Sequence, residues 1–282
     1  MEFIENHVLA PLTTFKIGGP ARYFCSVTNS DELRLSLKRA EKEQCKVFVL
    51  GNGSNCLFSD HGFDGLVIHN KISFCIEVCP GQYHVGAGYS LSKLGQELAR
   101  AGFGGLEFAA GIPGSVGGAV IMNAGANGQQ ISDILVSTEY IDENGDLEQL
   151  EAEFGYRYSS LQGKGGAVSS IHIRLAENKQ ARENQRQMLL ERKKKQPLNA
   201  KCAGCCFKNP AHISAGALIE QAGLKGKSMG GAQISQVHAN FIINTGSATA
   251  QDILDLMEYV RERVAKHSGI LLEPEVRIID GG

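Results

Sequence analysis

Three cysteines in the last third of the chain are the first residues with clear chemical potential. They are Cys202, Cys205 and Cys206, and the last two lie in the stretch AGCCFKNP at residues 203–210. Cys202 and Cys205 have the spacing of a metal clip, but the sequence supplies no second Cys-x-x-Cys or paired histidines to complete a structural zinc site. A disulfide between adjacent cysteines would be strained. We therefore predict no metal site, which leaves buried thiols or one thiol that acts as an acid.

Two glycine-rich stretches could hold a ligand by the backbone. They are GNGSNCL at 51–57 and GLEFAAGIPGSVGGAVIMNAGANG at 105–128. Glycine allows close backbone approach to a ligand, and neighbouring amides can bind an anion without a basic side chain. The second stretch holds seven glycines, so we expect it to be neither a helix nor a strand interior. Ligand-free tight turns are the alternative for both stretches, and the first lacks the third glycine of a Rossmann motif.

The elements that position these residues are short strands and helices in mixed order. Asn29-Ser30-Asp31, and Ser90 or Ser92, are expected to begin helices, and Gly102 to end the second one. Glu143-Asn144-Gly145 predicts a hairpin turn. Strands are predicted at 22–27, 46–51, 83–90, 167–175, 238–246 and 271–279, and further helices at 177–196, 214–223 and 249–269. A charged, apolar-poor segment places a domain boundary near 180–190.

Composition limits the classes of function. The chain has 282 residues, 43% of them hydrophobic, which is enough for about two domains with buried cores. Its 28 basic and 30 acidic residues give a net charge of −2, which argues against a broad nucleic-acid surface. No secretory signal is visible, and no apolar run reaches the ~18 residues of a membrane span. We expect a cytoplasmic protein with reduced cysteines and no nucleic-acid, membrane or obligate protein partner.

Taken together and in order, the motifs resemble UDP-N-acetylenolpyruvoylglucosamine reductases over nearly the whole chain. This family implies an α+β fold: a vanillyl-alcohol-oxidase-type (PCMH-like) FAD-binding domain of two subdomains, then an α+β substrate-binding domain. The implied parts are 1–70 with the final strand at 271–282, 71–185 and 186–270. The motifs are TTFKIGGPA (13–21), VLGNGSNCL (49–57), the stretch at 105–128, YR (156–157), CCFKNP (205–210), AGALIEQAGLKG (215–226), VHANFIINTGSAT (237–249) and LEPEVRII (272–279).

The resemblance implies an activity with two cofactors, FAD and NADPH. The reaction is the reduction of UDP-N-acetylglucosamine enolpyruvate to UDP-N-acetylmuramate in peptidoglycan precursor synthesis. A hydride goes from the reduced flavin to the enolpyruvyl group, so the protein must stabilise the developing negative charge and supply a proton.

The family's functional residues map onto particular positions of this chain. Arg157 and Glu275 match the charge-stabilising pair, and Cys205 matches the proton donor. Tyr156, Arg192, Lys195 and Asn209 match positions expected to contact substrate. The cofactor-binding residues would be Gly51, Asn52, Gly53, Ser54, Asn55, Gly111, Ile112, Gly114, Ser115, Gly117 and Gly118.

Two departures from the family pattern bear on mechanism. The proton donor is a serine in most members, whereas Cys205 is a thiol, which has an ordinary pKa of ~8.5 and is the stronger acid. Of the other cysteines, we expect five to be small buried apolar residues: Cys45, Cys56, Cys75, Cys79 and Cys206. No tyrosine occurs between Tyr158 and Tyr259, so the chain resembles the shorter subtype that lacks the family's tyrosine loop over the substrate.

Other interpretations of these residues remain open from the sequence. Arg157 could pair with a surface acid, and Glu273 could face the site in place of Glu275. The same flavin fold could serve a sugar or lactone oxidase, or a flavin-binding module without turnover.

Overall fold

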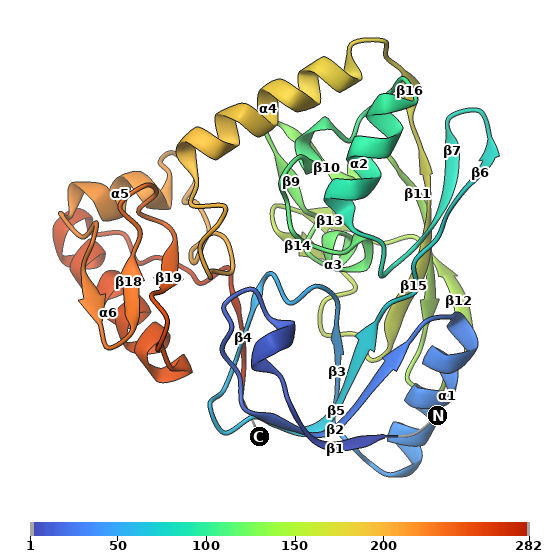
Figure 1. Ribbon diagram of the computed structural model, residues 1–282, viewed down its shortest axis with the longest axis horizontal. Helices are drawn as coiled ribbons and strands as arrows, with labels where there is room; N and C mark the ends of the chain where they lie inside the picture. The colour runs from blue at the N-terminus through green and yellow to red at the C-terminus, as the bar shows by residue number, and fades with distance from the viewer. Residues whose placement is uncertain (1–2, 281–282) are drawn as a thin grey trace. The chain divides into compact units, whose positions relative to one another are not determined.

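The computed structural model describes residues 3–280, which form two compact units (Figure 1). The first unit comprises residues 3–5, 23–52 and 65–192, and the second comprises residues 6–22, 53–64 and 193–280. The three parts implied by the family resemblance, two FAD-binding subdomains and a substrate-binding domain, are defined by function. That division stays a prediction.

Helix α1 (Ser30–Lys42) of the first unit packs on a four-stranded sheet, most of whose residues belong to the same unit. The helix begins where the sequence predicts, because the Asn29 side chain accepts a hydrogen bond from the Glu32 amide at 2.9 Å. Leu33 and Leu37 of the helix pack in one buried cluster with strand residues of this sheet. The strand order is β1 (Ile4–Val8), β2 (Pro20–Val27), β5 (Phe63–Asn70) and β3 (Val47–Leu50), with β3 and β5 parallel.

A five-stranded antiparallel sheet forms the rest of the first unit's framework. Its order is β12 (Leu147–Leu150), β11 (Leu135–Ile141), β15 (Ala167–Arg174), β7 (Gln82–Gly86) and β6 (Cys75–Cys79). The predicted hairpin joins β11 to β12, and Gly145 has the positive φ of 78° that its turn requires. One face of this sheet shares a buried cluster with α2 (Leu91–Arg100) and α3 (Val116–Ile121).

Helix α3 corrects the expectation that residues 105–128 contain no helix. Gly117 and Gly118 form its first turn, and the Ser115 side chain caps it by accepting from the Gly118 amide. A Cβ at Gly117 would lie 2.9 Å from the Cβ of Ala87. Close packing on the end of β7 therefore outweighs the poor helix propensity of glycine.

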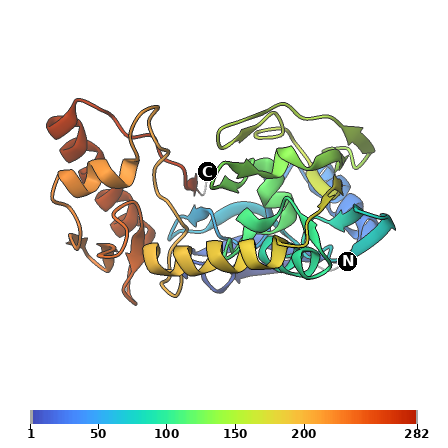
Figure 2. The same cartoon turned by 90° about the horizontal axis from the view of Figure 1, so that it is seen from above.

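The remaining elements of the first unit are short, except for α4 (Ala181–Lys195), of which residues 181–192 belong to this unit. This helix ends just before Pro197, as predicted, and both views show it as one uninterrupted helix (Figure 1, Figure 2). The short elements are β8 (Phe103–Gly104), η2 (Glu107–Ala109), β9 (Gly125–Ala126), β10 (Gln129–Gln130), η3 (Ile131–Asp133), β13 (Phe154–Gly155), β14 (Tyr158–Ser159) and β16 (Ala176–Glu177).

The second unit packs helices α5 (Ala215–Gln221) and α6 (Ala250–Ser268) in one buried cluster with β-strand residues. Thr249 and Asp252 form a capping box at the start of α6, and Gly269 ends it with a left-handed φ of 73°. No helix within residues 3–280 is long and apolar enough to cross a membrane. The other elements are η1 (Ala10–Leu12), β4 (Cys56–Phe58), β17 (Ser228–Met229), β18 (Ala232–Ile234), β19 (Ile242–Asn244) and β20 (Arg277–Ile279).

Two strands of the second unit are shorter than predicted. Strand β19 covers only Ile242–Asn244 of the predicted 238–246, and β20 covers only Arg277–Ile279 of 271–279. The residues before each strand hydrogen-bond to another segment, residues 206–208. Strand β20 pairs in parallel with β4.

Candidate active site

In the first unit, the two glycine-rich stretches meet. Gly51 comes directly after strand β3, and a Cβ at this position would lie 2.2 Å from the Ser115 hydroxyl oxygen. The Asn52 side-chain amide donates to the carbonyl of Pro113 at 2.9 Å. Glycine is therefore required at position 51 because the second loop occupies the space of a side chain.

The backbone amides of these two loops differ in their partners. Those of Gly111, Ile112, Gly117 and Gly118 donate within the unit, to Ser92, Ala109, Ala87 and Ser115 respectively. Within residues 3–280, the amides of Gly51, Asn52, Gly114 and Ser115 have no hydrogen-bond acceptor. A set of unused amides without a basic side chain fits the pyrophosphate of FAD. The other four amides already have acceptors, so their residues could contact the cofactor only through close approach of the backbone to it. That contact stays a prediction.

The rest of the first loop lies in the second unit, where it supports other segments. Gly53 has a φ of 61°, and its carbonyl accepts from the Thr14 amide at 3.0 Å. The Asn55 side chain donates to the carbonyl of Glu275 at 3.2 Å, and the Asn55 carbonyl accepts from the Arg277 amide. Asn55 thus holds the backbone of a predicted catalytic residue. Cofactor binding by Gly53, Ser54 and Asn55 stays a prediction.

Tyr156 and Arg157 form the turn of the hairpin between β13 and β14 in the first unit. Arg157 has a left-handed φ of 55°, a conformation that costs a non-glycine residue about 1–2 kcal/mol. Its guanidinium donates to the Gly125 carbonyl at 3.1 Å and lies 5.4 Å from the centre of the Tyr156 ring. Such strain is typical of positions whose side chain is held for a function.

Two amide side chains that the sequence did not single out hold this hairpin. Asn123, which is buried, donates to the Gly155 carbonyl at 2.9 Å, and Gln162 donates to the Arg157 carbonyl at 3.1 Å. The Ser159 hydroxyl ties β14 to Ile121, the last residue of α3. Ser115 precedes α3, and the hairpin that carries Arg157 is bound at the other end of this helix. Helix α3 is about 9 Å long, so the two predicted sites are separated by little more than the length of this helix. The only sequence signal for Asn123 was its place within the second glycine-rich stretch.

The predicted substrate-binding residues other than Tyr156 lie on separate segments. Arg192 is on α4, where its guanidinium donates to the Ala110 carbonyl at 3.3 Å, just before the loop at 111–118. Lys195 is the exposed last residue of α4. Asn209 is exposed, and its side-chain oxygen accepts from the Ala215 amide at the start of α5. Substrate contact by these three residues stays a prediction.

In the second unit, the backbone brings the Cys205 segment beside Glu275. Phe207 and Pro274 are antiparallel partners, flanked by a hydrogen bond from the Glu275 amide to the Cys206 carbonyl at 2.8 Å. The Lys208 amide donates to the Glu273 carbonyl, and the two side chains form an ion pair with Glu273 68% exposed. The Glu273 side chain is therefore committed to a surface pair, which favours Glu275 as the functional glutamate.

Asn240 holds the same segment from the other side. Its side-chain oxygen accepts from the Phe207 amide at 3.0 Å, and its side-chain nitrogen donates to the Phe207 carbonyl at 2.8 Å. Its own carbonyl accepts from the Cys206 amide. Asn240 is buried, so it satisfies backbone groups that cannot reach water. The sequence did not identify this residue.

The adjacent cysteines have different environments. Cys206 is buried and burial raises the pKa of its thiol, whereas Cys205 is half-buried beside Gly204, which has a φ of 78°. All eight cysteines are free thiols, and Cys202 and Cys205 belong to no group of metal-binding geometry among the described residues. Of the cysteines predicted to be buried, Cys56 and Cys206 are, Cys45 and Cys75 are half-buried, and Cys79 is exposed at the end of the edge strand β6.

Each unit thus assembles one part of the predicted constellation. The first brings the glycine-rich loops and the Arg157 turn to the two ends of α3, and the second brings Cys205 and Glu275 onto neighbouring backbone segments. The donors of the first unit suit an anion, and the thiol and carboxyl of the second can hold a proton.

Comparisons with known proteins identify the family of the chain. Residues 21–151 match the model of an FAD binding domain, and residues 196–279 match the UDP-N-acetylenolpyruvoylglucosamine reductase C-terminal domain. The chain is 48% identical to the UDP-N-acetylenolpyruvoylglucosamine reductase of Protochlamydia amoebophila, over 99% of this chain and 94% of that protein. It is 46% identical to that of Chlamydia muridarum, over 98% of this chain and 94% of the relative.

A solved structure shows the same architecture. The UDP-N-acetylenolpyruvylglucosamine reductase from Thermus caldophilus superposes with a TM-score of 0.84 at 39% identity, covering 99% of both chains. The predicted fold class, an FAD-binding domain followed by a C-terminal α+β domain, is thereby confirmed. The chain belongs to the UDP-N-acetylenolpyruvoylglucosamine reductase family of FAD-dependent oxidoreductases.

Proposed function

We propose that this chain reduces UDP-N-acetylglucosamine enolpyruvate to UDP-N-acetylmuramate with NADPH, and that Cys205 donates the proton. The family membership supports the reaction class. The observation that carries the residue assignment is the pairing of residues 206–207, directly after Cys205, with Pro274 and Glu275. A peptidoglycan precursor as product is consistent with action in the cytoplasm.

FAD, when bound, accepts electrons from NADPH and supplies a hydride to the enolpyruvyl double bond. The unused amides of Gly51, Asn52, Gly114 and Ser115 would hold its pyrophosphate. These amides are fixed by the strand and helix beside them, so they need little reorganisation to receive the anion.

Cys205 holds the proton at Sγ. A half-buried thiol can carry a proton and donate it to a substrate that reaches it. The positive φ of Gly204 lets the chain turn immediately before Cys205, while Cys206 anchors the segment in the core. The neighbouring buried thiol is unsuited to exchange with solvent.

Arg157 and Glu275 handle the charge that develops on the substrate carboxylate. A guanidinium keeps its charge at every accessible pH and can bind a carboxylate through two parallel hydrogen bonds. Glu275 faces a like charge in this role, so we assign it the neutral form, which can donate a hydrogen bond. Lys195, Arg192, Asn209 and Tyr156 would bind the remaining polar groups of the sugar nucleotide.

Steady-state turnover tests this proposal. NADPH consumption is measured with and without the enolpyruvyl sugar nucleotide, in air and under argon, and peroxide is assayed in parallel. We expect turnover that requires the sugar nucleotide and is the same in both atmospheres. Oxygen-dependent NADPH consumption with peroxide formation, in place of turnover that needs the sugar nucleotide, would contradict the proposal. A sugar or lactone oxidase would instead form peroxide from its own substrate without NADPH.

A further inference from the structure

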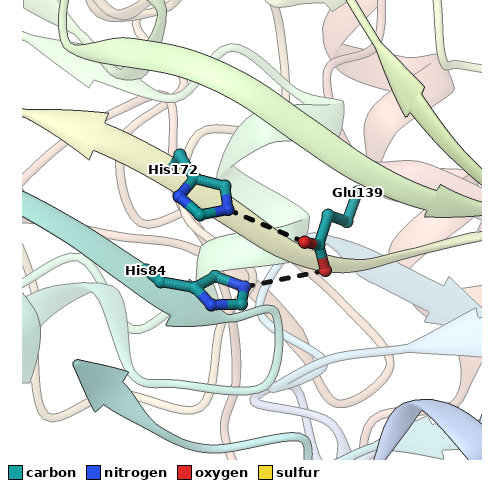
Figure 3. Close-up of side chains that lie close together, drawn as sticks. All are labelled: His84, Glu139 and His172. Atoms are coloured by element: carbon teal, nitrogen blue, oxygen red, sulfur yellow. Dashed lines mark ion pairs between the residues drawn. The ribbon is translucent and has the colours of Figure 1, made fainter. Parts of the chain in front are cut away.

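Three side chains with metal-binding groups converge on the five-stranded sheet of the first unit. They are His84 on β7, Glu139 on β11 and His172 on β15 (Figure 3). Each histidine Nε2 lies 3.6 Å from a different oxygen of the Glu139 carboxylate. The three ligand atoms lie within 4.8 Å of one another. None of these residues belongs to the predicted catalytic, cofactor-binding or substrate-binding set.

The strand pairing fixes this arrangement. His84 and His172 are direct antiparallel partners, and Glu139 is paired with Ser170, two residues from His172 on β15. Their neighbours Val85 and Ile171 are fully buried in the cluster shared with α2 and α3. Because side chains alternate across a strand, the two histidines face away from that cluster. A site on three adjacent strands holds its ligands more rigidly than a site on loops.

The surroundings of the cluster resemble the support that metal ligands receive. The Ser170 hydroxyl hydrogen-bonds to the Glu139 carboxylate and lies 2.9 Å from Nε2 of His84. Outer partners of this kind orient a ligating carboxylate. The Phe74 ring packs edge-on against His84 with centroids 4.9 Å apart, which restricts the movement of this imidazole.

The distances come close to those of a tetrahedral site, although the two histidines approach different oxygens of Glu139 and must share one ion. Zinc bonds of about 2.0–2.1 Å place neighbouring ligand atoms about 3.4 Å apart, close to the 3.6 Å between each histidine and Glu139. The imidazole rings are stacked, with centroids 4.3 Å apart and an angle of 11° between them. To share one ion they must tilt toward each other, which the broad χ2 torsion of histidine permits.

We propose that His84, Glu139 and His172 form a binding site for a first-row divalent cation, with zinc favoured by the two imidazoles and one carboxylate. Three protein ligands leave a fourth position for water. Each ligand is about a quarter to a third exposed, so the ion can enter from solvent. The bound ion would cross-link β7, β11 and β15. The site is independent of the proposed reaction.

Calorimetric titration of the FAD-loaded protein with ZnCl₂, after chelator treatment and dialysis, tests this proposal. We expect one site per chain, together with a rise in the thermal unfolding midpoint at saturating zinc. Cobalt(II) absorption provides the second readout, because tetrahedral nitrogen and oxygen ligation gives visible bands without the thiolate charge-transfer band that cysteine ligation adds.

Four variants connect the signal to the cluster. His172→Ala should weaken zinc binding by more than the roughly 10- to 100-fold that loss of an outer partner costs, and Ser170→Ala should weaken it within that range. Glu139→Gln preserves the side-chain shape and should also weaken binding, which keeps the test valid if His172→Ala does not fold. His61→Ala removes an exposed histidine of the second unit and should leave binding unchanged.

Two results would overturn the site. One is the absence of binding, which would make the cluster a metal-free hydrogen-bond network. The other is binding that persists unchanged in folded His172→Ala or Glu139→Gln, or that shows thiolate charge transfer. Unchanged binding would place the ion elsewhere in the chain, and a thiolate band would place it at cysteines.

Discussion

The turn at Tyr156–Arg157 and the segment at Cys205–Phe207 each present one predicted functional side chain, but they are built in opposite ways. Arg157 adopts a left-handed φ of 55° in a short hairpin whose support comes from the side chains of Asn123, Gln162 and Ser159. Cys205 needs no such strain, because Gly204 takes the positive φ and backbone pairing with residues 273–275 holds residues 206–208.

The difference shows two routes to a fixed side chain. In the hairpin, a few side-chain hydrogen bonds hold a strained backbone conformation, and glycine at position 157 would adopt that conformation without the strain. In the cysteine segment, the anchor is a buried neighbour, Cys206, and a buried amide, Asn240. Substitutions in the two regions should therefore differ in how strongly they change activity and how strongly they change the free energy of unfolding.

The largest expected effect is loss of the proton donor. Cys205→Ala should lower kcat by roughly 10²- to 10⁴-fold, the usual contribution of a general acid, while Cys205→Ser keeps a hydroxyl that can donate and retains measurable turnover. Both variants should keep bound FAD, because Cys205 lies outside the glycine-rich loops. An alanine variant with full activity would remove Cys205 from the mechanism.

The two glutamates of the Glu-Pro-Glu motif should respond very differently. Glu275→Ala should lower kcat by roughly 10- to 100-fold, since it removes a hydrogen bond to a charged group, which is worth about 1.5–3 kcal/mol. Glu273→Ala loses only a pair in which the glutamate is 68% exposed, so kcat should stay within about twofold. Equal losses in steady-state assays of the two variants would contradict the assignment.

Asn240→Ala tests the anchor of the cysteine segment. It leaves the buried amide and carbonyl of Phe207 without partners, which should reduce the free energy of unfolding by about 1–3 kcal/mol. Urea unfolding measures this loss, and Gln187→Ala, at an exposed amide with one partner on the same helix, should change it by less than about 0.5 kcal/mol. Similar values for both variants would mean that Asn240 is not an anchor.

The smallest effect concerns strain at Arg157. Arg157→Gly and Arg157→Ala both remove the guanidinium, but only glycine tolerates a φ of 55° at little cost. The glycine variant should therefore be more stable by about 1 kcal/mol, with both variants poorly active. Equal unfolding midpoints would show that the turn relaxes when the side chain is removed.

Local signals predicted much of the secondary structure. Asn29 and Ser90 cap helices because their short side chains reach amides three residues ahead, a contact contained in the sequence itself. The helix at Gly117 and Gly118 could not be predicted, because its cause is the approach of Ala87 from another element. The predicted lengths of β19 and β20 were wrong for a similar reason, because the residues before each strand pair with the segment at 206–208.

The candidate site likewise contains residues that the sequence predicted and residues that only the tertiary structure reveals. Cys205, Arg157 and Glu275 could be named through motifs that resemble a family, but Asn123 and Asn240 act through hydrogen bonds to distant backbone. The cluster of His84, Glu139 and His172 depends on the order of three strands, which no local pattern contains. Tertiary pairing explains each of these omissions.

An anaerobic spectral titration tests the central claim most directly. The FAD-loaded protein is reduced with NADPH, and the enolpyruvyl sugar nucleotide is then added without oxygen. We predict that the flavin bands bleach in the first step and return in the second, and that their return is slowed in Cys205→Ala. Bands that return only when air is admitted would contradict the account.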